Sequence, residues 1–114
     1  MLWKRVPLTK LRLLKLLRMS KFDFSELTEG RFELVGEMSF GTASEILKIS
    51  EPLFNQHQVL EIDLSQVKRA DSAGLALLLE WKAQANQRGS EIVFVGIPDS
   101  LLAIAQTTEV GHLI

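Results

Sequence analysis

Val59-Leu60-Glu61-Ile62-Asp63-Leu64, followed by Ala70-Asp71-Ser72-Ala73-Gly74-Leu75-Ala76-Leu77-Leu78, decides the fold of this 114-residue chain. The first stretch has the pattern of a buried strand, and the second opens an apolar helix that has a natural stop at Gly89. Ser72 is therefore predicted on the first turn of a helix, beside Asp71. Such a junction presents unpaired backbone N–H groups and the positive end of the helix dipole. It can hold a phosphate or offer a small docking point to another protein, and we favour docking.

Strand and helix patterns alternate on both sides of this junction. The other expected elements are, in chain order, a hairpin of 21–27 and 31–35 that ends at Gly36, a helix over 46–54 capped by Thr42 or Ser44, a polar loop over 65–69, a strand over 91–96 covered on both faces, a helix over 101–105 capped by Asp99 or Ser100, and an edge strand over 110–114. This β-β-α-β-α-β-α order predicts an α/β fold. We expect a mixed, mainly parallel sheet of four to five strands with the helices packed mostly on one face.

Length and composition fit one globular domain and exclude several kinds of site. The chain is 46% hydrophobic and 24% charged, which is ordinary for such a domain. It has no cysteine, so disulfides and thiolate metal sites are excluded. His57 and His112 are not in a metal-ligand spacing, so we expect no metal and no cofactor. No apolar run reaches the roughly 18–20 residues of a membrane span.

Charge divides the chain into two parts. Residues 1–18 carry six of the 13 basic residues and none of the 14 acidic residues. We therefore expect a basic leader over 1–18 and a single domain over 19–114. The leader has three interpretations: an extension from a mis-called start codon, a disordered or partner-binding tail, or an amphipathic helix on a membrane surface. The acidic remainder argues against nucleic acid as a partner.

The helix that begins at Ser72 has more apolar surface than one sheet contact requires. One apolar stripe can pack on the sheet, while Ala73, Leu77 and Trp81 lie on a different line. Burying Leu77 would be worth roughly 1.5–3 kcal/mol, so a partner over these residues would recover that free energy. The alternative is that neighbouring segments of the chain already cover them.

The sequence gives no support for catalysis. Ser72 has no histidine or lysine nearby in the sequence to activate it as a nucleophile. Neither a glycine-rich phosphate loop nor a Gly-x-Ser-x-Gly elbow is present. Glu61 and Asp63 share a strand face, but no supporting cluster for a metal accompanies them. We therefore expect a protein that is not an enzyme and has no catalytic residues.

The Ile62-Asp63-Leu64-Ser65 strand end and the Asp71-Ser72-Ala73-Gly74-Leu75 junction resemble the STAS domain family over about residues 20–110. That family includes anti-sigma factor antagonists and the C-terminal domains of sulfate transporters. Within it, residues 74–81 are most similar to the small cytoplasmic STAS subunits (MlaB-like) of Mla-type phospholipid ABC transporters.

This resemblance implies a non-enzymatic subunit that binds the transporter's ATPase subunit (MlaF-like) and, through it, the permease complex. The subunit would be cytoplasmic and peripheral to the inner membrane, and would support transporter assembly and activity in maintaining outer-membrane lipid asymmetry. The implied partner-binding residues are Asp71, Ser72, Ala73, Gly74 and Leu77.

Two alternatives remain open. One is an anti-sigma factor antagonist, in which the residue matching Ser72 is phosphorylated by the anti-sigma kinase. A phosphate adds a charge of about −1.5 to −2 beside Asp71, which would expel an apolar partner. The chain departs from that pattern at Ala73, where a second serine is usual, and at Met38-Ser39, where many members carry an aspartate. The other alternative is an interaction module of a different transport or signalling assembly.

Overall fold

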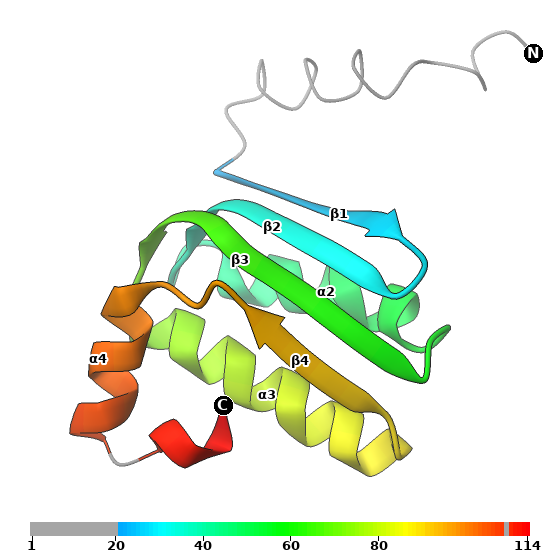
Figure 1. The fold of residues 1–114 in the computed structure, drawn as a ribbon. Coiled ribbons are helices and arrows are strands. Elements are labelled where there is room, and N and C mark those ends of the chain that lie inside the picture. Colours follow the sequence, from blue (N-terminus) through cyan, green and yellow to red (C-terminus); the bar gives the residue numbers. More distant parts are fainter. Residues whose placement is uncertain (1–20, 109) are drawn as a thin grey trace, which may run out of the picture.

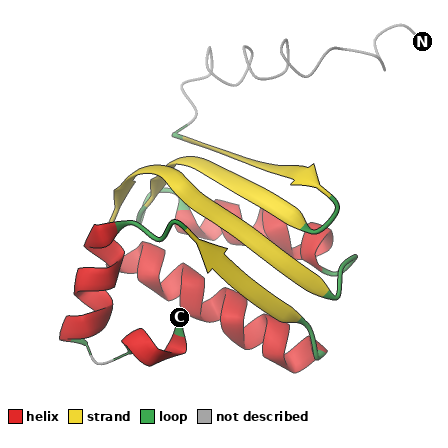
Figure 2. Cartoon of the chain, in the orientation of Figure 1, coloured by secondary structure: helices red, strands yellow, loops and turns green. Residues whose placement is uncertain are grey.

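A four-stranded sheet forms one layer of the structure, and helices form the other (Figure 1, Figure 2). The computed structural model describes residues 21–108 and 110–114. The elements are β1 (Phe22–Thr28), β2 (Arg31–Met38), α2 (Ala43–Phe54), β3 (Val59–Ala70), α3 (Ser72–Arg88), β4 (Glu91–Val95), α4 (Asp99–Thr107) and the 3-10 helix η2 (Gly111–Leu113). In this part of the chain no helix has both the length and the hydropathy that a membrane span requires.

The sheet topology confirms the predicted fold class. The strands lie in the order β1-β2-β3-β4; β1 pairs antiparallel with β2, whereas β2–β3 and β3–β4 pair parallel. Helices α2 and α3 cover the same face of the sheet (Figure 1). Each parallel connection contains a helix that carries the chain back across the sheet. At one of these connections α3 begins at Ser72, directly after β3 ends at Ala70.

The core lies between the sheet and helices α2 and α3. Alternate side chains of β2 and β3 point toward the helices and are fully buried, since successive strand residues face opposite sides. They are Phe32, Leu34, Leu60, Ile62 and Leu64. Trp81 of α3 lies at the centre, with ring centroids of Phe24, Phe54 and Phe94 at 6.0, 5.5 and 6.2 Å from its own. These aromatic contacts join α3 to both α2 and the sheet.

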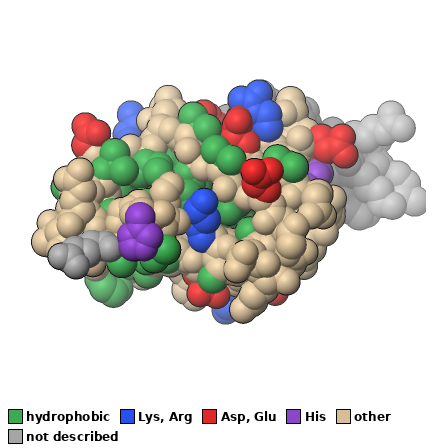
Figure 3. Space-filling model, turned by 60° about the horizontal axis from the view of Figure 1, so that its bottom comes forward, with side chains coloured by type: hydrophobic (Ala, Val, Ile, Leu, Met, Phe, Trp, Pro, Cys, Tyr) green, Lys and Arg blue, Asp and Glu red, His purple; other side chains and the backbone are tan. Residues whose placement is uncertain are grey.

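Seen from the side of α3 and α4, the molecule shows scattered charged side chains and a gathering of hydrophobic ones toward α4 and the C-terminal segment (Figure 3). Leu102 of α4 and Leu113 of η2 are both exposed.

A buried hydrogen bond links the two helices that cover the sheet. The indole Nε1 of Trp81 donates to the Ser50 hydroxyl at 2.9 Å, and that hydroxyl donates to the Leu47 carbonyl at 3.0 Å. Both side chains are fully buried, so neither polar group has access to water. The chain thus satisfies the only polar atom of its largest core residue from within the core.

We expect Ser50→Ala to lower the free energy of unfolding by about 1–3 kcal/mol, because the buried indole N–H loses its acceptor. Urea unfolding of the described domain measures this loss. Ser44→Ala is the matched control on the same helix; Ser44 is exposed, so its change should stay within about 0.5 kcal/mol. Equal effects of the two substitutions would contradict the role given to Ser50.

Two predicted boundaries in the sheet are wrong. The polar loop expected over 65–69 is strand, because β3 continues as a parallel ladder with β2, with Gln66 opposite Val35 and Arg69 opposite Glu37. Gly36 lies inside β2 rather than at its end. It adopts a φ of 103° where a Cβ would overlap the Lys21 carbonyl oxygen. Polar composition indicated a loop, but an exposed strand carries polar residues equally well.

The C-terminal half also differs from the prediction. Strand β4 is not covered on both faces, because Val93 and Val95 are 47% and 42% exposed on an edge strand. The N-cap of α4 is Pro98 instead of Asp99 or Ser100, and residues 111–113 form a 3-10 helix instead of an edge strand.

Candidate functional site

Asp71 joins three segments at the start of α3. As the N-cap residue, it accepts a hydrogen bond at Oδ1 from the Ala73 N–H, 2.9 Å away. Its Oδ2 accepts from the N–H of Phe40 at 3.2 Å, and its own N–H donates to the Met38 carbonyl. Both carboxylate oxygens are therefore engaged by backbone, so Asp71 fixes the loop after β2 against the first turn of α3.

Thr42 contributes to the same loop in a way that differs from the prediction. It occupies the N-cap position of α2, but its hydroxyl makes no capping bond. The hydroxyl donates to the Glu37 carbonyl at 2.9 Å and accepts from the Ser39 N–H at 3.0 Å. Because Thr42 is buried, these bonds hold the turn that presents Phe40.

Gly74 lets α3 approach the end of β2 closely. The residue is buried, and a Cβ there would lie 2.7 Å from the Met38 carbonyl oxygen and 3.1 Å from the Met38 Cβ. A carbonyl oxygen in a strand end cannot move away as a flexible side chain can. Glycine is thus required for packing, and the residue shapes the site without being exposed at it.

We expect Gly74→Ala to lower the free energy of unfolding by about 1–3 kcal/mol, because overpacking against backbone outweighs the roughly 1 kcal/mol by which alanine favours a helix. Chemical unfolding measures it. Gly41→Ala is the control, since a Cβ there would meet its nearest atoms only at 3.9 Å. A Gly74→Ala protein as stable as the unmodified chain would contradict this packing.

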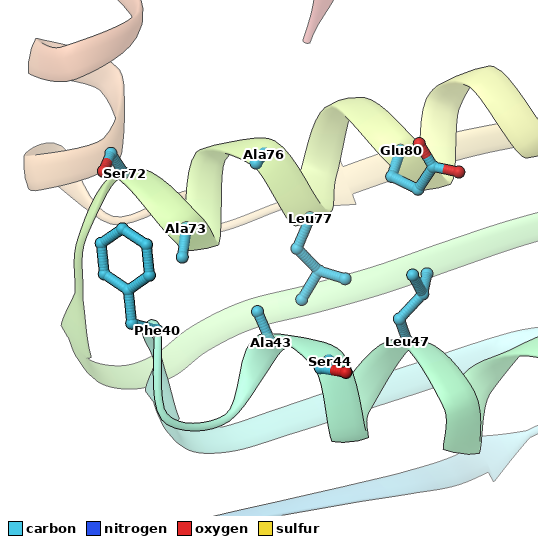
Figure 4. Close-up of a pocket in the computed structure, with 9 residues that line it drawn as sticks. All are labelled: Phe40, Ala43, Ser44, Leu47, Ser72, Ala73, Ala76, Leu77 and Glu80. Carbon is cyan, nitrogen blue, oxygen red and sulfur yellow. The ribbon is translucent and has the colours of Figure 1, made fainter.

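A groove of about 600 Å³ lies between α2 and α3, beside Ser72 (Figure 4). We call it the α2–α3 groove. Its lining residues are Phe40, Ala43, Ser44, Leu47, Ser72, Ala73, Ala76, Leu77 and Glu80. Leu47 and Leu77 point toward each other from the two helices, and the Phe40 ring lies next to Ser72 (Figure 4). The groove is therefore an apolar recess with small residues along one wall and a single carboxylate at one end.

Phe40 and Ser72 are two of the exposed residues that line the groove, and they lie next to each other at its mouth. Phe40 is 79% exposed, the largest exposure of any large hydrophobic residue in the described chain. Ser72 is also exposed, and its hydroxyl makes no hydrogen bond within residues 21–108 and 110–114. An aromatic ring left in water beside an available hydroxyl is a combination suited to contact with another macromolecule.

The structure corrects the expected apolar surface on α3. Leu77 is only 3% exposed and Trp81 is fully buried, so of the two interpretations left open by the sequence, coverage by a neighbouring segment of the chain is the correct one. The reason is that α2 packs alongside α3, with Leu47 of α2 pointing toward Leu77 (Figure 4). Leu77 forms the floor of the groove, while Phe40 and Ala76 supply its exposed apolar surface.

Of the five residues expected to bind a partner, three line the groove and two support it. Ser72, Ala73 and Leu77 are lining residues, whereas Asp71 and Gly74 hold the first turn of α3 in place. Sequence reasoning missed the opposite wall, which comes from Phe40 and α2. A signal existed: Phe40 stands between Ser39 and Gly41, where a turn usually carries only small or polar residues.

The groove is equipped for binding more than for a reaction. Its lining offers hydroxyls and one carboxylate, but neither histidine nor lysine to activate Ser72. Across the described ranges, no three His, Asp or Glu side chains gather closely enough to hold a metal ion.

A protein-family model matches most of the chain. The family model described as "Mlab, STAS domain" matches residues 12–114. A search of curated proteins found no significant match.

Solved structures share the fold at low sequence identity. The unphosphorylated anti-sigma factor antagonist SpoIIAA is similar with a TM-score of 0.63 and 14% identity, covering 81% of this chain and 84% of that one. The phosphorylated form of SpoIIAA, a Bacillus cell fate determinant, gives 0.60 and 17%, covering 81% and 86%. A sulfate transporter family protein from Wolinella succinogenes gives 0.58 and 19%, covering 75% and 72%. At these identities the likeness extends to the fold alone.

Proposed function

The chain belongs to the STAS domain family, through the family model that carries the MlaB description, and on that basis we propose that it is the STAS subunit of an Mla-type phospholipid ABC transporter. In this proposal it has no catalytic activity of its own. It binds the ATPase subunit (MlaF-like) through the α2–α3 groove and is held at the cytoplasmic side of the inner membrane by that contact. Through the ATPase it supports assembly and activity of the permease complex, and so maintains outer-membrane lipid asymmetry.

The observation that carries the proposal is the exposed Phe40 ring beside the available Ser72 hydroxyl. An aromatic side chain buries about 150–250 Å² when it is covered, so Phe40 can act as an anchor of an interface. Ala73 and Ala76 leave room for a partner's backbone or apolar side chain to approach α3 closely. The Ser72 hydroxyl can exchange a hydrogen bond with that partner without the cost of a buried charge.

Co-purification tests this proposal. A tagged chain is co-expressed with the ATPase and permease subunits of an Mla-type transporter from the same organism, and the complex is followed by size-exclusion chromatography. The expected result is retention of the ATPase at a fixed ratio, and its loss with Phe40→Asp. Val93→Asp is the matched control, because Val93 is an exposed apolar residue on β4, which carries no groove residue.

Retention of the ATPase by Phe40→Asp at the unmodified ratio would contradict the groove as the docking surface. No retention by the unmodified chain would contradict the transporter role itself. In that case, transfer of phosphate to Ser72 by a serine kinase encoded nearby would favour the anti-sigma factor antagonist alternative, for which Ser72 is suitably exposed.

A further inference from the structure

The sheet face opposite α2 and α3 is covered by no helix of the described chain (Figure 1). We call it the open face. Strand alternation places Glu33, Asp63 and Val95 in one row across it, since these residues are register partners on β2, β3 and β4. Glu61 and Val93 form the next row. Three valines of this face, Val59, Val93 and Val95, are 58%, 47% and 42% exposed.

Carboxylates dominate the charge of the open face. By the same alternation its acidic residues are Asp23, Glu33, Glu37, Glu61, Asp63 and Glu91. Two basic residues of the strands share this face: Arg31 pairs with Glu61 at 2.7 Å, and Arg69 lies opposite Glu37. Hydrogen bonds from the hydroxyl and the N–H of Ser65 lower the pKa of Asp63, which favours the charged form of this carboxyl. The face is thus a negative surface with an exposed apolar side along β4.

The sequence that precedes β1 has the complementary composition. Residues 1–18 contain six basic residues, no acidic residue and several leucines. In helical conformation, residues 1–18 would extend about 27 Å, compared with about 14 Å between the outer strands of a four-stranded sheet. The leader is therefore long enough to cross the face, and it is joined to β1 at one edge of that face.

We propose that the leader of this chain binds its own open face. Its basic side chains contact the carboxylates, and its leucines cover the exposed valines of β3 and β4. The basic residues concerned are Lys10, Arg12, Lys15 and Arg18. The α2–α3 groove would bind this segment less well than the open face, because Glu80 is the only acidic residue that lines the groove. Exposed ion pairs are individually weak, so several pairs together with leucine burial carry the contact.

The absence of cysteine allows a direct test in the full chain. A nitroxide is attached at Leu14→Cys in isotope-labelled protein. NMR then measures how strongly the nitroxide broadens the signal of each backbone amide. The amides of Glu61, Val93 and Val95 are expected to lose most of their intensity, while those on the exposed side of α3 keep theirs. Raised salt should restore the lost signals, because it screens the ion pairs. Reversal of all four basic residues to glutamate, in the same labelled chain, should restore them fully.

Three outcomes would overturn the proposal. Equal broadening of the open face and α3, or none at either, would show that the leader does not select the open face. In a mixture of isotope-labelled chains without nitroxide and nitroxide-bearing chains without isotope labels, the same broadening would assign the contact to a second molecule. A last outcome combines two results: the open face shows no broadening, and the chain binds phosphatidylglycerol vesicles. If reversal of the four basic residues abolishes that binding, the leader is assigned to an anionic lipid surface.

Discussion

Ser72→Glu is expected to abolish binding of the ATPase subunit while leaving the fold intact. The substitution puts a charge and three more heavy atoms at the mouth of an apolar groove, where a docked partner would leave the carboxylate desolvated and unpaired. The fold should tolerate it, because Ser72 is exposed and an acidic residue on the first turn favours the helix. Isothermal titration calorimetry should give at least about a hundredfold rise in Kd, or roughly 2.7 kcal/mol.

Gln87→Glu is the matched control for this change. It adds the same charge to an exposed position of the same helix, about 22 Å further along its axis. Its Kd should equal that of the unmodified chain. A Ser72→Glu protein that unfolds at the unmodified urea midpoint and still binds the ATPase with unchanged Kd would show that the interface lies elsewhere.

Trp81→Ala is expected to lower the free energy of unfolding by about 3–5 kcal/mol. The side chain is fully buried between three phenylalanine rings, and its removal also leaves Ser50 without its hydrogen-bond donor. Since single domains are stable by only about 5–15 kcal/mol, this loss is a large part of the total. Urea unfolding followed by far-UV circular dichroism measures it without the tryptophan signal that the substitution removes.

Trp81→Phe keeps most of the apolar volume and should cost less than half as much. The pair also separates two roles for this position. Weaker ATPase binding by Trp81→Ala with unchanged stability would place Trp81 on the partner surface, contrary to its burial.

Sequence pattern was sufficient for the elements with a strong local signal. Helix α3 runs from Ser72 to Arg88 as predicted, because Asp71 caps its start and Gly89 adopts a left-handed φ of 70° at its end. The mixed, mainly parallel sheet followed from the alternation of strands and helices, since parallel neighbours require a crossover. These features depend on residues close together in the chain.

The site was only half predictable, for a physical reason. Periodicity identifies which residues share a face of α3, but it does not say which element covers that face. The sequence left open whether Leu77 lies at the surface, and α2 covers it, whereas Phe40 projects from a loop that has no period. The leader expected over residues 1–18 lies outside the described residues, and so does the expected boundary between it and the domain at residue 19.

The most direct test follows methyl NMR signals of the full chain as the ATPase subunit is added. Docking in the α2–α3 groove predicts that signals of Ala73, Ala76 and Leu47 shift or broaden at stoichiometric ATPase, while those of Val93 and Val95 on the open face do not move. Shifts confined to the two valines, with the groove methyls unchanged, would contradict docking in the groove.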